Sequence, residues 1–418
     1  MSRTSPLVVA LALALPAVAA GQTVDATALT LLSGRQDPRD GQVHTVVPAF
    51  EDIWLTARDL DIPGVTGTKI VVSGWGMVAG GDLIDGSDNV TGDLDVGYIE
   101  GKVLDRRLFL RLGRQLVASG VARNLQLDGL DAVARLPAGF TVEVYGGVPV
   151  APRFGYTYGS GAVGGRLSWR PTRVFEGGVS FVEVLDDGRA DRQEVGADAR
   201  LFLGDQVTLN GLAAFSAIEA RLSEASLRAL WQARRNLELT LEANRVAPDL
   251  FVSRNSIFSV FAEDNRDELG TTLFFRPVPR LRLYGDGFAV NDDSGTGGRA
   301  GLRAALALDG ENATTLGAEG RVLALPGSRY LQGRLFGAHR FGKKVTATLD
   351  CDAVWLDPAI NGQDLSLTFA GTVGWDFSPG WKALASALTG QTPLLEWRTE
   401  VMGKLVYNYD YHARRVSP

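Results

Sequence analysis

Charged side chains recur at every second position in several segments of this 418-residue chain. Within residues 345–353, Asp350 and Asp352 alternate with Leu349 and Cys351. A period of two places the charged residues on one face of an extended strand and the apolar residues on the other. Guanidinium and carboxylate groups that face a water-filled passage act on dissolved ions and polar solutes. The chemistry that this pattern indicates is therefore selection among small solutes.

The candidate pore-lining residues share this alternation and a charge. The basic candidates are Arg107, Arg111, Arg299, Arg303, Arg334 and Arg340, and the acidic candidates are Glu238, Glu242, Asp350 and Asp352. Arginines would favour anions and carboxylates would favour cations. The assignment depends on strand parity, because a one-residue bulge inverts the two faces of its strand.

Residues that could carry catalysis are sparse. The chain has three histidines and one cysteine, and a Ser–His–acid site needs a histidine beside its nucleophile. His44 lies near the N-terminus, His412 lies near the C-terminus, and His339 shares the parity of apolar Leu335 and Phe341. We therefore expect no catalytic residues, no cofactor and no metal site. Cys351 has apolar parity and is interpreted as a small filler.

Two glycine-rich stretches match phosphate-binding motifs only in part. Residues 337–344, GAHRFGKK, lack the final Ser or Thr of a P-loop, and they fall at a turn between strands. Residues 159–164, GSGAVG, fit the dinucleotide pattern but precede a strand rather than a helix. Both are interpreted as ordinary turns and loops.

Composition excludes further classes. The chain has 42 basic and 48 acidic residues, so its formal net charge is −6, and it offers no general reason to expect nucleic acid as a partner. A single cysteine cannot form an internal disulfide.

The N-terminus has the features of a cleaved signal peptide. Arg3 precedes the apolar run from Leu7 to Leu15, and small residues precede Ala20. After residue 20 no apolar run approaches the length of a transmembrane helix. The exported chain is thus expected either to be soluble outside the cytoplasm or to insert as a β-barrel.

The elements that position the charged residues are long alternating segments. They run for about 9–12 residues, which suits a strand that crosses a bilayer. We predict an all-β fold, a single transmembrane antiparallel up-and-down β-barrel of about 18 strands, with 16 to 20 acceptable. The expected divisions are a signal peptide at 1–20, a periplasmic lead-in or small plug at 21–49, the barrel at 50–411 and a C-terminal tail at 412–418.

Aromatic residues fit the girdles of such a barrel. Trp rings near strand ends or on the apolar face, and Tyr407, Tyr409 and Tyr411 near the C-terminus, suit the two membrane–water interfaces. The tryptophans concerned are Trp169, Trp231, Trp355, Trp375 and Trp397.

Residues 108–134 resemble the porin-like and alginate-export-like outer-membrane barrels. The resemblance lies in Gly113-Arg114-Gln115 at the end of one strand and Leu127-Asp128-Gly129 in the next. It covers under a tenth of the chain. It implies passage of small hydrophilic solutes through a lumen whose arginines act on anions. One departure is that the chain continues past its alternating tyrosines to Pro418, rather than ending on an aromatic residue.

The sequence therefore predicts a channel of the outer membrane for small hydrophilic solutes, with anions as one class. Its expected partners are outer-membrane lipids, those solutes and the barrel-assembly machinery, and a homo-oligomer stays open. Two alternatives also stay open. One is a plugged export or scaffold barrel that serves a polysaccharide or a partner complex, and the other is an outer-membrane barrel enzyme.

Overall fold

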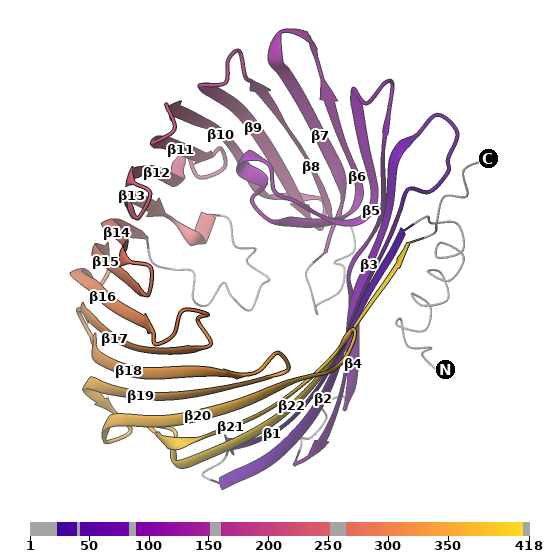
Figure 1. The fold of residues 1–418 in the computed structure, drawn as a ribbon. Coiled ribbons are helices and arrows are strands. Elements are labelled where there is room, and N and C mark those ends of the chain that lie inside the picture. Colours follow the sequence, from indigo (N-terminus) through magenta and orange to yellow (C-terminus); the bar gives the residue numbers. More distant parts are fainter. Residues whose placement is uncertain (1–22, 40–41, 83–88, 151–159, 251–264, 413–418) are drawn as a thin grey trace.

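The computed structural model describes residues 23–39, 42–82, 89–150, 160–250 and 265–412. These residues form 22 antiparallel strands, in which each strand pairs with the next along the chain (Figure 1). In chain order the strands are β1 (Thr23–Arg39), β2 (Gln42–Arg58), β3 (Thr66–Gly81), β4 (Val90–Val103), β5 (Leu108–Val117), β6 (Leu125–Arg135), β7 (Phe140–Pro149), β8 (Gly161–Trp169), β9 (Phe175–Asp186), β10 (Arg189–Leu203), β11 (Val207–Ser216), β12 (Arg221–Arg234), β13 (Leu237–Val246), β14 (Arg266–Val278), β15 (Leu281–Asp292), β16 (Gly295–Ala307), β17 (Thr314–Leu325), β18 (Ser328–Phe341), β19 (Val345–Ile360), β20 (Gln363–Ser378), β21 (Trp381–Thr392) and β22 (Leu395–His412). Among the described residues, no helix is long and apolar enough to cross a membrane.

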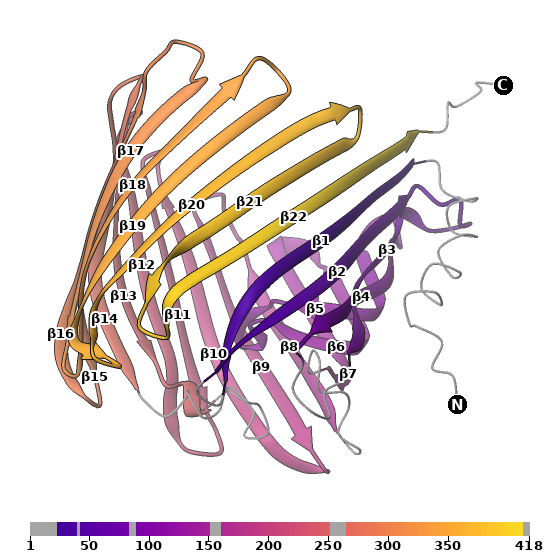
Figure 2. The same cartoon turned by 90° about the horizontal axis from the view of Figure 1, so that it is seen from below.

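The sheet closes on itself through its first and last strands. β1 pairs with β2 on one side and with β22 on the other, from Thr23 opposite His412 to Arg35 opposite Glu400. Closure leaves no edge strand with unpaired backbone groups, which is the condition for crossing a bilayer with strands. The predicted antiparallel up-and-down barrel is confirmed, and Figure 2 shows its strands running obliquely around the wall.

The number of strands is 22 rather than the expected 18. The expectation assumed roughly 20 residues for each strand with its connection, whereas residues 23–412 allot about 18 to each. One reason is that residues 23–49, expected to precede the barrel, form β1 and the start of β2. The other lies in the turns, because several hairpins turn in two residues at either end of the barrel. Examples are residues 187–188, 326–327 and 361–362 at one end and 279–280 and 379–380 at the other.

The expected lead-in or plug at residues 21–49 is wrong for the described part of that segment. Residues 23–39 form β1, and residues 42–49 begin β2. The alternation of polar and apolar residues in β1 is weak, because Leu29 and Leu31 lie on the same face as Asp25 and both faces therefore carry apolar residues. The barrel therefore extends from Thr23 to His412. The predicted signal peptide at 1–20 and all of the predicted tail except His412 lie outside the described residues.

The outer face of the barrel is apolar and exposed. Leu349, Leu269 and Leu335 expose 72%, 66% and 64% of their surface, although each lies well within a strand. A contiguous surface of this kind is unfavourable in water and matches the lipid-facing band of an outer-membrane barrel.

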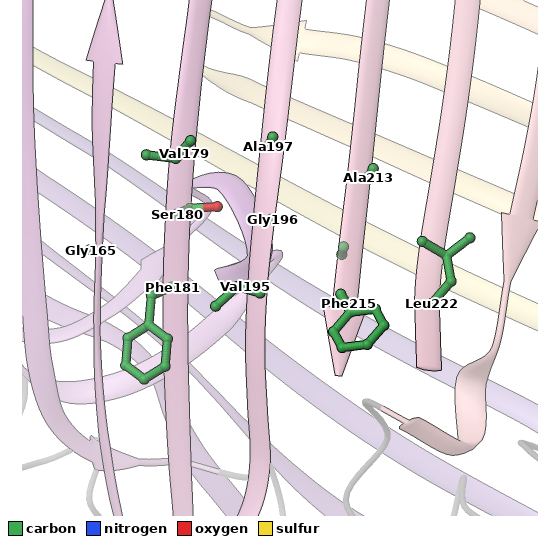
Figure 3. Close-up of a pocket in the computed structure, with 11 residues that line it drawn as sticks. Gly165, Val179, Ser180, Phe181, Val195, Gly196, Ala197, Ala213, Phe215 and Leu222 are labelled. Carbon is green, nitrogen blue, oxygen red and sulfur yellow. The ribbon is translucent and has the colours of Figure 1, made fainter. Parts of the chain in front are cut away.

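A shallow apolar hollow of about 540 Å³ interrupts this outer face between β8 and β12. Small residues such as Gly165 and Ala197 form its floor, and Figure 3 shows Val179, Phe181 and Phe215 around it. Ser180 lies on the opposite face of β9, where its hydroxyl accepts a hydrogen bond from the backbone N–H of Val121. The two faces of these strands therefore meet different surroundings.

The two ends of the barrel differ. The start of β1 and the end of β22 lie together at one end, here named the terminal end. The odd-numbered strands end at the opposite end, and the longer connections in sequence, residues 118–124, 150–160 and 247–265 among them, each follow an odd-numbered strand. Outer-membrane barrels have short periplasmic turns and longer extracellular loops, so this asymmetry favours a periplasmic position for the terminal end.

Aromatic rings gather at the terminal end. Phe140 stacks on Trp169 with ring centroids 5.9 Å apart, and the ring centroids of Trp381 and Tyr407 are 4.4 Å apart. Trp375 and Trp231 also lie near the ends of their strands there, whereas Trp355 and Trp397 lie toward the other end. The arrangement is that of two aromatic girdles flanking an apolar band.

Candidate functional site

The inner face of the barrel carries ion pairs between neighbouring strands. Residues directly opposite each other in an antiparallel pair have Cβ atoms about 5 Å apart, so opposite charges placed there come into contact. Arg111 of β5 lies opposite Glu100 of β4, and its Nε and Nη2 atoms both lie 2.9 Å from Oε2 of that glutamate. The same guanidinium stacks on the ring of Tyr98, 4.7 Å from its centroid.

One run of contacts crosses β17, β18 and β19. Arg334 donates from Nε to Oδ1 of Asp350 at 2.8 Å, and its Nη1 lies 3.7 Å from Oε2 of Glu319. Glu319 also accepts a hydrogen bond from Arg321. Asp352 lies opposite Arg334 but accepts its hydrogen bond from Gln332, at 2.6 Å. Arg334, Asp350 and Asp352 therefore share one face, as the alternation predicts.

Arg299 lies in a second group, on β14, β15 and β16. Its Nη2 atom lies 3.3 Å from Oε2 of Glu268, and its Nη1 atom lies 3.4 Å from Oδ2 of Asp286. The guanidinium also stacks on Phe288, 4.0 Å from the ring centroid. On the neighbouring strands Glu242 lies opposite Arg228, with Oε1 3.6 Å from its Nε.

Four candidate residues stand apart from these pairs. Arg303, Arg340 and Glu238 lie on the inner face, and none of them forms an ion pair within the part of the chain that the structure describes. Arg107 is placed differently from the expectation, because β5 begins only at Leu108. Arg107 is an exposed residue of the turn after Val103, where positive φ angles of 51° to 67° at residues 104–106 reverse the chain. Whether the other nine candidates line a conducting pore stays a prediction.

A segment that the sequence did not single out folds against the inner wall. Residues 118–124 join β5 to β6 and include a short 3-10 turn, η1 (Gly120–Ala122). η1 packs against β9 and β10, and Figure 1 shows the connection from β5 to β6 on the inside of the ring. Val121 and Ala122 are buried with Leu127, Tyr145 and Val182 in an apolar cluster. The barrel is therefore narrowed on this side.

A buried glutamate fastens this segment to the wall. The side chain of Glu194, on β10, is fully buried and accepts hydrogen bonds from Arg123, Arg192 and Ser223. Arg123 belongs to the segment, and its Nε also donates to Glu224 at 2.7 Å. Burial without partners would strongly disfavour the carboxylate, so the arginines and the hydroxyl are what allow it to lie there.

The sequence held little sign of this contact. Arg123 belongs to a short connection without regular alternation, and its partners lie 71 and 101 residues away. Glu194 alternates with apolar Val195 and Ala197 in β10, but strand parity does not show that Arg123 reaches it. A single sequence shows which residues lie in a connection, but not whether that connection turns outward or folds inward.

The histidine, the cysteine and the glycine-rich stretches that were expected to have no catalytic or binding role lie in strands and turns. His339 lies on the outer face, where its Nδ1 atom is 2.8 Å from the Thr314 hydroxyl. The ring centroids of His339 and Phe341 are 4.3 Å apart. Cys351 is a free cysteine on the same outer face as Leu349. Residues 337–344 form the end of β18 and its turn, and residues 161–164 begin β8. Within the described ranges, no group of three or more His, Cys, Asp or Glu residues is placed to hold a metal ion.

The fold and the inner wall define a closed β-barrel of the outer-membrane type. No protein-family model matches the chain, and no curated protein matches it. The translocation pore of the P pilus usher (PapC) is similar in structure, with a TM-score of 0.55 and 10% identity over 92% of this chain and 99% of that one.

Two porins are also similar in shape. A BenF-like porin from Pseudomonas fluorescens Pf-5 gives a TM-score of 0.48 at 11% identity, covering 93% of this chain and 98% of that one. OccK5 (OpdH) from Pseudomonas aeruginosa gives 0.46 at 11% identity, covering 94% and 99%. The usher pore supports the barrel fold and nothing about a solute. The usher pore agrees with the barrel fold that the resemblance implied, and no comparison supports its alginate-export part.

Proposed function

We propose that this chain is an outer-membrane channel through which small hydrophilic solutes diffuse, with a charged wall that selects among them. The observation that carries the proposal is the contrast between the two faces of one closed wall. The outer face exposes Leu269, Leu335 and Leu349, whereas the inner face presents paired and unpaired charges. Fixed charges of both signs in a wide lumen hold water and favour polar solutes over apolar ones.

The proposal includes a location and partners. The chain is exported by its N-terminal signal peptide, inserted by the barrel-assembly machinery and surrounded by outer-membrane lipids, with its terminal end toward the periplasm. Wall arginines such as Arg299 and Arg334 interact with solute anions, whereas Asp352 and Glu238 interact with cations. Arg303 and Arg340, which form no ion pair with the residues that the structure describes, also interact with anions.

Solute uptake into liposomes tests the proposal. Liposomes that contain the refolded full chain should swell when placed in isotonic sugar solutions, and the rate should fall as the sugar becomes larger, because the lumen restricts diffusion. Liposomes without protein and liposomes with heat-unfolded protein provide the controls. Absence of swelling by protein that is folded and inserted would contradict an open channel.

A second candidate is a plugged export or scaffold barrel. Two observations favour it: the circumference of 22 strands and the segment at residues 118–124 that packs inward. Outer-membrane transporters with 22 strands hold a plug in the lumen, whereas porins with 16 to 18 strands leave an aqueous channel. This candidate predicts no swelling for any sugar, and deletion of residues 118–124 would then be the first variant to restore it.

A further inference from the structure

A pocket in the inner wall combines basic and aromatic side chains. It has a volume of about 490 Å³ and lies on β14 to β18, where Phe274, Tyr284, Arg303, Arg321 and Phe336 contribute to its lining. The lining contains three arginines, with Arg282 as the third, and no acidic residue. This volume falls in the range of small-molecule sites.

Two of these arginines are not neutralised by a carboxylate. Arg282 and Arg303 are exposed, and neither forms an ion pair among the residues that the structure describes. Glu319 lies opposite Arg303 in the register, but its carboxylate contacts Arg321 and Arg334 instead. Two guanidinium groups in this pocket are therefore available to an anion from solution.

Two of the three aromatic side chains of the pocket are exposed. Phe274 and Tyr284 lie directly opposite each other in β14 and β15 and expose 39% and 38% of their surface. The Phe336 ring lies over Gly317, where a Cβ atom would overlap it. Arg303 stacks on that ring, with its guanidinium carbon 4.6 Å from the centroid. Large apolar surface that faces water at one place indicates a binding surface.

We propose that this pocket binds organic anions with a flat aromatic body, of the aromatic carboxylate class. The carboxylate would accept hydrogen bonds from Arg282 and Arg303, and the ring would stack on Phe274 and Tyr284. The inference rests on the proposed function only in assigning the pocket to a solute pathway. Among the described residues, the acids beside the lining leave Arg282 and Arg303 without an ion pair, because Glu319 contacts Arg321 and Arg334, and Asp286 contacts Arg299. Glu238 lies opposite Phe274, on the side away from Tyr284.

Equilibrium binding to the refolded full chain in detergent tests this site, with 2-naphthoate as the fluorescent probe. The fluorescence anisotropy of 2-naphthoate should rise saturably with protein concentration. Benzoate should displace the probe at concentrations about fivefold lower than cyclohexanecarboxylate, which has the same charge but a puckered ring that stacks poorly. Equal displacement by the two acids would overturn the aromatic part of the proposal.

Two sets of variants locate the binding. Combined Arg282→Gln and Arg303→Gln changes should weaken 2-naphthoate binding by about tenfold or more, because the charged hydrogen bonds are lost. Arg200→Gln is the matched control, since Arg200 is an exposed inner-face arginine on β10 that donates to Asn210. Its binding constant should stay within about twofold of the parent. Unchanged binding in the double variant, or equal weakening in the control, would refute the site.

Detergent binding and conduction in a membrane are separate readouts. A folded barrel that binds 2-naphthoate with this arginine dependence but does not pass solutes would refute the proposed function and retain the site. A barrel that passes solutes but shows no preference for benzoate over cyclohexanecarboxylate would refute the site and retain the function.

Discussion

At the residue scale, the ion pairs of the inner wall differ in how deeply their side chains are buried. The contribution of each pair to stability therefore differs as well. Glu194 is fully buried and is held by two arginines and a serine. Glu400 pairs with Arg398 at 2.6 Å in a partly exposed position. An exposed pair contributes little to stability, whereas a buried charge that loses its partners is strongly destabilising.

The first prediction concerns Glu194→Gln. The change removes the carboxylate that Arg123 and Arg192 share and leaves Glu224 as a carboxylate partner of Arg123, so we expect a loss of about 3 kcal/mol in unfolding free energy and looser attachment of residues 118–124 to the wall. Urea unfolding followed by tryptophan fluorescence measures the first effect, and faster trypsin cleavage after Arg123 measures the second. Glu400→Gln is the control and should change the unfolding free energy by about 1 kcal/mol or less. Equal effects of the two changes would contradict the fastening role of Glu194.

The second prediction concerns the selectivity of the wall. Arg303→Ala combined with Arg340→Ala removes two positive charges, so the reversal potential in a salt gradient should shift toward cation preference. Asp350→Asn combined with Asp352→Asn should shift it toward anion preference. Shifts of the same sign, or unchanged reversal potentials in both variants, would contradict the assignment of these residues to the conducting wall.

At the scale of single elements, one row of glycines shapes β5, β6 and β7. Gly113, Gly129 and Gly147 lie side by side in the register. Gly113 has a φ angle of 124°, and a Cβ atom there would overlap the carbonyl oxygen of Gly97. Only glycine adopts such a backbone conformation without strain.

The third prediction follows from this strain. Gly113→Ala should lower the unfolding free energy by about 2 kcal/mol, because the added methyl group forces the backbone of β4 and β5 apart. Gly287→Ala is the matched control, since a Cβ atom at Gly287 meets no atom within 4 Å. The urea midpoints of the two variants measure the difference. A Gly113 variant as stable as the Gly287 variant would contradict the close approach of β4 and β5.

The sequence predicted a strand correctly where the two faces of that strand differ clearly in polarity. β19 separates Asp350 and Asp352 from Leu349 and Cys351, so its faces were assigned correctly. β1 mixes leucine and threonine on both faces, so periodicity did not reveal it as a strand. Turn lengths depend on backbone conformation at one or two residues, and the strand count was therefore too low.

The candidate site was predicted to a similar extent, and for a related reason. Side chains within strands follow parity, so Arg111, Arg299 and Arg334 lie on the charged face. Pairing partners required the register, which parity does not supply. The contact of Arg123 with Glu194 required the path of a connection in space, and no local pattern encodes that path.

At the scale of the whole molecule, the orientation of the wall toward lipid gives the fourth prediction. Leu349 faces outward as the fifth residue of β19, and its neighbour Thr348 faces inward. Leu349→Arg should lower stability in a bilayer by about 2–4 kcal/mol, because it places a charge in the apolar band. Thr348→Arg should have little effect, because its side chain meets the lumen. Unfolding in liposomes measures both, and a larger loss for Thr348→Arg would reverse the two faces.

The single-channel conductance of the refolded full chain in a planar bilayer decides whether the barrel encloses an open channel. A closed wall of 22 strands with a charged inner face predicts discrete, ohmic current steps that persist across the voltages applied. Glu194→Gln should enlarge these steps, because residues 118–124, attached more loosely to the wall, narrow the lumen less. A folded and inserted barrel that gives no current, in both the parent and the Glu194 variant, would contradict an open channel.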